Sequence, residues 1–145
     1  MPNLAKLRER GKYTVARCLY PTASGYNWAS CLYGTVADLH GFRDATPAPH
    51  VKPMVVTAKG RHPCIFSEIR RQEPSAFTCA LYNWEPLRDL SRPGSLEYAF
   101  FNRGKTIGWE VSNRVLTEQA IDLLAQNASD FTFLYLGWEG KPLPL

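Results

Sequence analysis

Hydrophobic and polar residues alternate along residues 94–102 and 105–111, and strict alternation is the pattern of half-buried β-strands. Gly104 lies between the two segments and can adopt the positive φ that a tight hairpin turn requires. With the turn at this glycine, Tyr98 faces Trp109, and the other large apolar side chains share their side of the ribbon. The pattern therefore predicts an antiparallel β-hairpin with one buried face.

The same register places Glu97 directly opposite Glu110 on the other face of the hairpin. Like charges in directly opposed positions repel each other, and two such carboxyl groups can share a proton. A pair of this kind can act as acid and base, hold a cation or recognise an amine. Glu97 and Glu110 are therefore the candidate catalytic residues. The alternative is a solvated outer face on which an Arg or Lys of the next strand neutralises both.

Apolar, aromatic and β-branched residues predict five further strands elsewhere in the chain, at 12–20, 54–58, 64–71, 76–84 and 131–136. The last of these segments is apolar on both faces, which is typical of a central strand that is covered from two sides.

Capping residues and helical spacing predict helices at 4–10, after Asn3, and at 118–127, after Thr117. Residues 27–40 are ambiguous. Their apolar positions recur at helical spacing, whereas Gly34 and the β-branched residues that follow it favour a strand. We expect a helix there.

These elements predict a single α+β domain over residues 1–145, the size at which one hydrophobic core suffices. We expect a curved, mostly antiparallel sheet of five to seven strands, with the 118–127 helix packed on one face and one or two N-terminal helices. Residues 44–53 contain three prolines and predict an extended crossover loop at the surface. The alternative for this loop is an arm or lid over a site or a partner subunit.

Aromatic residues make up 12% of the chain, which favours surfaces that bind flat or apolar groups. A curved sheet with a helix behind it often encloses a pocket at its open end. Four aromatic residues of the predicted strands are therefore the candidate ligand-binding residues, namely Tyr82, Trp84, Tyr98 and Trp109.

Motifs for several common kinds of chemistry are missing from the sequence. It contains neither GxGxxG nor GxxxxGK[ST] for phosphate binding, no GxSxG nucleophile elbow, and no CxxC, HxH or HExxH metal-binding spacing. We therefore predict no metal and no cofactor.

The four cysteines lie far apart among apolar neighbours, which predicts buried free thiols in a reducing compartment. No segment approaches the roughly 20 apolar residues of a membrane span, and residues 1–10 lack a secretory pattern, so a cytoplasmic location is expected.

The net charge of +4 is distributed unevenly. Residues 1–12 carry four basic residues and one acidic residue, residues 52–71 carry five and one, and residues 115–145 carry one and four. Oppositely charged ends favour self-association, so we expect a homodimer. The basic segments also leave binding to nucleic acid open.

Three functional classes fit these observations. The first is a non-enzymatic domain that binds a small apolar molecule or a protein partner through an aromatic-lined sheet face or pocket. The second is a small cofactor-free hydrolase or isomerase that uses the paired carboxylates. The third is an accessory protein that binds nucleic acid. We favour the first, because the sequence lacks reaction motifs.

Overall fold

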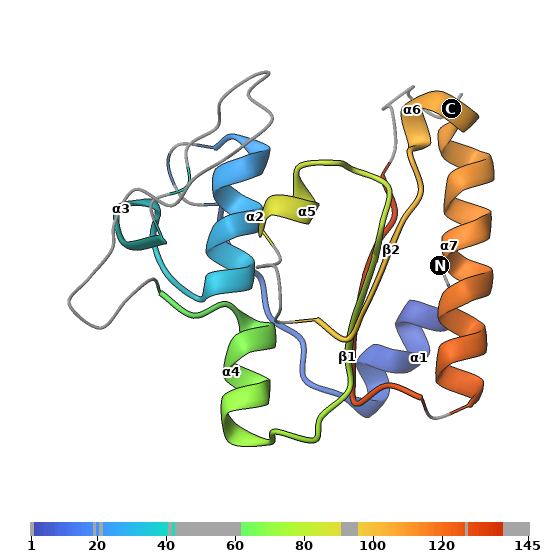
Figure 1. Cartoon of the computed structure of the whole chain (residues 1–145), viewed down its shortest axis with the longest axis horizontal. Coiled ribbons are helices and arrows are strands. Elements are labelled where there is room, and N and C mark those ends of the chain that lie inside the picture. The colour runs from blue at the N-terminus through green and yellow to red at the C-terminus, as the bar shows by residue number, and fades with distance from the viewer. Residues whose placement is uncertain are drawn as a thin grey trace.

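The computed structural model describes residues 2–18, 20, 22–40, 42, 62–90, 96–126 and 128–137. Within these ranges a small parallel sheet lies between helices on both of its faces (Figure 1). The sheet has three strands, which are β1 (Thr78–Tyr82), β2 (Tyr98–Phe101) and β3 (Phe131–Tyr135).

The strand order is β2-β1-β3, and both outer strands run parallel to β1. Ala80 of β1 aligns with Ala99 of β2 and with Phe133 of β3. Every residue of β1 is buried, because helices cover both faces of the sheet. A continuous apolar run is the usual sequence of such a strand.

One face of the sheet is covered by the long helix α7 (Trp109–Ala125). Leu116 and Ala120 of this helix pack against Cys79 and Leu81 of β1, and all four side chains are buried. Leu116 and Ala120 are four residues apart, so they lie on the same side of the helix. This packing fixes α7 along the sheet (Figure 1).

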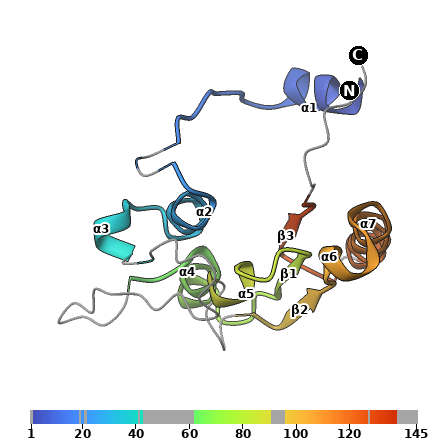
Figure 2. The same ribbon diagram turned by 90° about the horizontal axis from the view of Figure 1, so that it is seen from above.

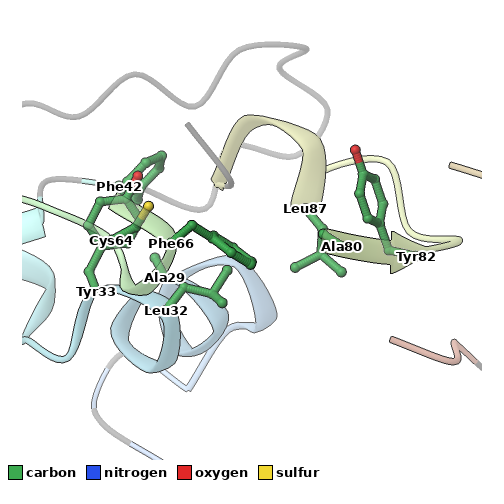
Figure 3. Packing of buried hydrophobic residues seen from close by; sticks show 9 residues of the cluster. All are labelled: Ala29, Leu32, Tyr33, Phe42, Cys64, Phe66, Ala80, Tyr82 and Leu87. Atoms are coloured by element: carbon green, nitrogen blue, oxygen red, sulfur yellow. The ribbon is translucent and has the colours of Figure 1, made fainter. Parts of the chain in front are cut away.

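The opposite face is covered by α2 (Ser24–Tyr33), α4 (Ile65–Gln72) and the short α5 (Leu87–Leu90). Figure 3 shows their buried side chains, with Leu32 and Phe66 on the helical side and Ala80 on the strand. Two short helices, α3 (Ala37–His40) and α6 (Gly104–Ile107), complete the described body.

The N-terminal helix α1 (Pro2–Arg10) lies apart from this body and is joined to it by extended backbone (Figure 2). Its two leucines remain 55% and 61% exposed, at Leu4 and Leu7. The guanidinium of Arg8 lies 4.1 Å over the ring of Tyr13, beside an open concavity of about 400 Å³. An amphipathic helix normally buries its apolar stripe, and α1 does not.

The predicted fold is wrong in its sheet, which has three parallel strands where we expected five to seven mostly antiparallel ones. The hairpin is the main error. Its first half is a strand, β2, but residues 104–107 and 109–125 are helical. The alternation over 105–111 lasts for only seven residues, whereas the buried positions Ser112, Leu116 and Ala120 follow helical spacing over more than two turns of a 17-residue helix.

The main helix is longer than predicted, because it begins at Trp109 and not at Thr117. Thr117 lies inside α7, where its hydroxyl donates a hydrogen bond to the carbonyl oxygen of Asn113 at 2.7 Å. A threonine in mid-helix often makes this bond to the preceding turn. The same residue type that caps a helix start therefore misled the prediction.

Two other strand predictions are also wrong. The segment predicted as a strand at 64–71 is largely α4 (Ile65–Gln72), in which Phe66 is fully buried and Glu68 pairs with Arg71 three residues later. Residues 12–18 are extended, but they are exposed and belong to no strand. The β-forming residues of that segment therefore have no neighbouring strand with which to pair among the described residues.

Several predictions are confirmed by the described elements. The helix at 4–10 is α1, the strand at 76–84 contains β1, and most of 27–40 is helical, with a break at Gly34, whose φ is +61°. The strand at 131–136 is β3, although it lies at an edge of the described sheet and not at its centre. The predicted loop at 44–53 and the strand at 54–58 lie outside the described residues.

All four cysteines are free, and the prediction of buried thiols is confirmed for Cys64 and Cys79, whereas Cys18 and Cys31 are exposed. Over the described part of the chain, none of the helices combines the length and the apolar character that a membrane crossing needs.

Candidate ligand site at the carboxyl ends of the strands

The carboxyl ends of the three parallel strands lie at the same edge of the sheet, near α5 and α6 (Figure 1). Asn83 directly follows β1, Asn102 follows β2, and Gly137 comes two residues after β3. Open parallel sheets bind their ligands in the crevice outside this edge. We call this end of the sheet the carboxyl edge, and its polar groups are the candidates for a ligand site.

A closed set of three hydrogen bonds joins the carboxyl edge to α7. The amide nitrogen Nδ2 of Asn83 donates to Oδ1 of Asn113 at 2.7 Å. Nδ2 of Asn113 donates to the carbonyl oxygen of Gly137 at 3.0 Å, and the backbone N–H of Gly137 donates to Oδ1 of Asn83 at 2.8 Å. Asn83 is only 2% exposed, so these bonds lie in a low-dielectric environment where they hold the ends of β1 and β3 in place.

The indole ring of Trp109 packs between two glycines at the same edge. A Cβ added to Gly104 would lie 2.5 Å from the ring, and one added to Gly137 would lie 2.4 Å from it. Both positions therefore need glycine. The indole Nε1–H is buried and has no acceptor among the described residues, which makes it an unused donor beside the strand ends.

A charged side chain stands at the rim of this edge. Arg103 follows β2, and its guanidinium pairs at 3.1 Å with Glu85, which lies in the loop after β1. The two side chains are 57% and 50% exposed. An exposed pair of this kind is weak, so an anionic ligand can replace the carboxylate on the guanidinium at little cost.

Aromatic rings form the apolar part of the carboxyl edge. Tyr82 and Phe101, the last residues of β1 and β2, have ring centroids 5.5 Å apart. Trp84 lies 6.0 Å from Tyr135 of β3 by the same measure, and burial raises the pKa of Tyr135. These rings pack against the core, so they shape the edge and stiffen it.

Three of the four aromatic residues predicted from sequence lie near this edge. Tyr82 ends β1, Trp84 follows it, and Trp109 lies against Gly104 and Gly137. Tyr98 starts β2 at the opposite end of the sheet and packs on the α7 side. The structure therefore does not bring Tyr98 together with the other three.

Glu97 and Glu110 do not face each other, because the hairpin that paired them does not form. Glu97 precedes β2 and accepts hydrogen bonds from the backbone N–H of Thr78 at 2.9 Å and from its hydroxyl at 3.0 Å. It also forms an ion pair with Arg70 of α4. Glu110 lies exposed in the first turn of α7. The register that proposed an acid–base pair is wrong.

A serine and a histidine lie in contact elsewhere, but their hydrogen bonds argue against a catalytic dyad. His40 is 1% exposed, and its Nδ1 accepts the backbone N–H of Phe42 at 3.0 Å. The proton of the neutral ring must then sit on Nε2, which lies 3.1 Å from the hydroxyl of Ser30 and donates to it. Nε2 cannot accept the serine proton in this state. Desolvation by burial, aided by the charge of His62, lowers the pKa of His40.

Metal binding finds no support in this part of the molecule. The described residues contain no group of three or more His, Cys, Asp and Glu side chains arranged to hold a metal ion. The polar groups that meet at the carboxyl edge include amides, the indole N–H of Trp109 and the Arg103–Glu85 ion pair, and the guanidinium of that pair is the kind of group that binds an anion.

Comparison with known proteins yields a fold and no family. No protein-family model and no curated protein matches the chain. Among solved structures, the chain is similar to phosphonoacetate hydrolase from Sinorhizobium meliloti 1021 in complex with phosphonoacetate. The match has a TM-score of 0.58 and 18% sequence identity, and it covers 93% of this chain and 40% of that one. A likeness at this identity concerns the fold alone, and the chain spans about 40% of the length of that hydrolase.

The sequence interpretation overlooked Asn83, Arg103, Asn113 and Gly137. One signal was available, because Asn83 and Asn102 each directly follow an apolar strand segment. Such positions share an edge when the strands are parallel, and the predicted sheet, which was mostly antiparallel, offered no reason to place them together.

Proposed function

We propose that the chain is a hydrolase-type α/β domain that binds a small anionic substrate at the carboxyl edge of its sheet. The anion, of the carboxylate or phosphonate class, contacts the guanidinium of Arg103 after displacing Glu85. The observation that carries the proposal is the meeting of three parallel strand ends at one edge that holds an exposed cation and a rigid amide network. The fold likeness to a phosphonoacetate hydrolase supports the choice of substrate class.

The residues of this edge have distinct roles in the proposal. Arg103 binds the anion, since a guanidinium can donate two parallel hydrogen bonds to a carboxylate or phosphonate. The hydrogen bonds of Asn83, Asn113 and Gly137 keep the strand ends fixed, so that the site does not need to be ordered when the substrate arrives. The chain spans about 40% of the length of its structural neighbour, and the role proposed for its own residues is to bind and orient the substrate.

The other two functional classes receive less support from the geometry. The non-enzymatic binder was inferred from the aromatic content and the lack of reaction motifs, and its site was expected on a curved, mostly antiparallel sheet, whereas the observed sheet is parallel. The nucleic-acid binder relied on the basic segments, of which Arg70 pairs with Glu97 and Arg71 pairs with Glu68. The other basic residues at 52–71, which are Lys52, Lys59 and Arg61, lie outside the described residues. Both classes remain distinguishable from the hydrolase by experiment.

The test uses phosphonoacetate as the probe, with the full chain in isothermal titration calorimetry and in an assay of phosphate release. We expect saturable binding that Arg103→Ala weakens by about tenfold or more, the loss of one charge-assisted contact. Arg71→Ala is the matched control, because Arg71 is also exposed and ion-paired but belongs to α4, away from the strand ends.

The outcomes separate the parts of the proposal. Equal binding by Arg103→Ala and the wild-type chain would remove Arg103 from the site. Binding without phosphate release would retain the anion site and reject the hydrolase. No binding at all, in a chain with intact circular dichroism, would reject both.

A further inference from the structure

The exposed N-terminal helix presents an apolar stripe that the rest of the described chain leaves uncovered. Leu4 and Leu7 lie three residues apart on one side of α1 and are 55% and 61% exposed. Arg8 and Arg10 flank this stripe. Leucines at this spacing normally face a partner surface, because removing their apolar side chains from water is favourable.

A second uncovered apolar surface lies on the outer side of α7, away from the sheet. Ile121 and Leu124 are each 58% exposed, whereas Leu116 and Ala120 of the same helix are buried on the sheet side. Glu118 and Asp122 lie beside these exposed residues and are exposed as well. The surface is thus an apolar patch with an acidic border, and we call it the outer α7 patch.

The two surfaces complement each other in charge as well as in apolar character. Residues 1–12 carry four basic residues against one acidic residue, and the acidic residues at the outer α7 patch are Glu118 and Asp122. Contact between them would bring Arg8 and Arg10 to Glu118 and Asp122 while the leucines cover Ile121 and Leu124. Complementary rims of this kind fix orientation and speed association.

The position of α1 favours a contact between two molecules. Figure 2 shows α1 set apart from α7 and the sheet, with extended residues leading back to α2. Extended backbone spans about 3.3 Å per residue, so residues 11–18 can separate α1 from the rest of its own molecule by at most about 25 Å. We propose that α1 of one copy docks on the outer α7 patch of a second copy, and the reverse contact closes a two-fold dimer.

Disulfide trapping tests this contact directly. Two chains are made in a background of Cys18→Ser and Cys31→Ser, which removes the exposed native thiols, and one carries Leu7→Cys while the other carries Ile121→Cys. We expect a cross-linked dimer on mild oxidation of the mixture and little from either chain alone, because each new cysteine faces the opposite surface of its partner. Absence of a cross-link in the mixture would overturn the proposal.

The chain that carries both Leu7→Cys and Ile121→Cys distinguishes docking within one molecule. Oxidation to a monomer that has lost two thiols would show that α1 folds back on its own α7, and this result would also overturn the proposal. Cross-linked dimers of the double variant would support it.

Light scattering during gel filtration provides a second readout that depends on no new cysteine. We expect a dimer for the native chain and a monomer for Leu7→Glu, whose exposed position leaves the core intact. Val36→Glu is the control, because Val36 is 47% exposed but lies between α2 and α3. A monomeric native chain, or a dimeric Leu7→Glu, would overturn the proposal. Because Leu7 is absent from the carboxyl edge, these results are independent of phosphonoacetate binding.

Discussion

The two ends of the parallel sheet use their polar residues differently. At the amino ends of the strands, Glu97 and Asp130 each precede an outer strand and accept backbone N–H groups at the start of the central strand, from Thr78 at 2.9 Å and from Phe77 at 2.7 Å. At the carboxyl ends, amides bind one another, Arg103 pairs with an exposed Glu85, and the indole N–H of Trp109 has no acceptor among the described residues.

The difference indicates which end is available to a ligand. The carboxylates of the amino end are occupied by the backbone of β1 and, for Glu97, also by Arg70. A ligand there would have to break bonds that hold the sheet together. At the carboxyl end a ligand displaces one weak surface ion pair, while the buried amide network stays intact. Acidic residues just before a strand are therefore poor evidence for a catalytic site when they accept backbone N–H groups of the neighbouring strand.

The largest expected effect is that of filling the glycine space at the carboxyl end. In Gly137→Ala the new Cβ would lie 2.4 Å from the ring of Trp109 and 2.7 Å from Oδ1 of Asn83. We expect a loss of about 3 kcal/mol in the free energy of unfolding, measured with urea, because neither neighbour can move without breaking other contacts. Gly11→Ala, in the exposed arm, is the control and should change it by less than about 0.5 kcal/mol. A stable Gly137→Ala would contradict the packing of Trp109.

Removing the buried amide at the carboxyl end should have the next largest effect. Asn83→Ala leaves the N–H of Gly137 and Oδ1 of Asn113 without their partner. We expect a loss of about 2 kcal/mol in urea unfolding, the cost of unpaired buried polar groups. Asn83→Asp keeps the acceptor for Gly137 but places a second carboxylate oxygen against Oδ1 of Asn113 in a buried position, so it should lose at least as much. If Asn83→Asp were as stable as the native chain, the assignment of donor and acceptor atoms to these bonds would be wrong.

At the amino end the corresponding change should affect stability alone. Glu97→Gln keeps an oxygen that accepts from Thr78 but loses the charge that pairs with Arg70. We expect a loss of about 0.5–1 kcal/mol in urea unfolding, since the arginine is partly exposed. The affinity for phosphonoacetate, measured by calorimetry, should stay unchanged. A tenfold weaker affinity would place Glu97 in the ligand site after all.

The smallest effect concerns pH and acts through a residue that belongs to neither end of the sheet. The pKa of His40 is lowered from 6.5, first by burial and then by the charge of His62, while Asp38 opposes the shift. Below pH 6.5 the unfolded chain therefore binds a proton that the folded chain binds less well, and stability falls as the pH falls through this range. Proton NMR should give a His40 pKa below 6.5.

The variant His40→Asn isolates this pH dependence, because its amide oxygen can replace Nδ1 as the acceptor for Phe42. The decrease in urea stability between neutral pH and pH 5 should be smaller in this variant than in the native chain. An identical decrease in stability in both chains would show that titratable groups other than His40 cause the pH dependence.

The sequence predicted β1 well, because its pattern of apolar residues is a strong local signal. The buried run of β1 and its two faces follow from alternation, since Cys79 and Leu81 pack toward α7 while Ala80 and Tyr82 pack toward α2 and α4. The start of α7 could not be placed, because Trp109 and Glu110 fit a strand as well as a helix and are decided by the contact of the indole with Gly104 and Gly137.

The direction of strand pairing was the decisive unknown. Antiparallel and parallel sheets share the same β-forming residues, and only the connection distinguishes them, since a parallel pair needs a crossover that is commonly helical. α7 is such a crossover, because it connects β2 to β3. The first turns of α7 were predicted to be a strand, and this error replaced a parallel strand–helix–strand unit with an antiparallel hairpin. Because the sheet was predicted to be mostly antiparallel, the carboxyl edge and its residues Asn83 and Arg103 could not be predicted as a site.

A titration of the isotope-labelled chain with phosphonoacetate, followed by proton–nitrogen NMR, tests the ligand site most directly. The indole resonance of Trp109, identified by its loss in Trp109→Phe, and the backbone resonances of residues 83–85 and 102–104 should shift as the site fills. The resonances of residues 77–78, 97 and 130 at the amino end should stay in place. Shifts confined to the amino end, or no shifts at any phosphonoacetate concentration, would contradict a ligand site at the carboxyl edge.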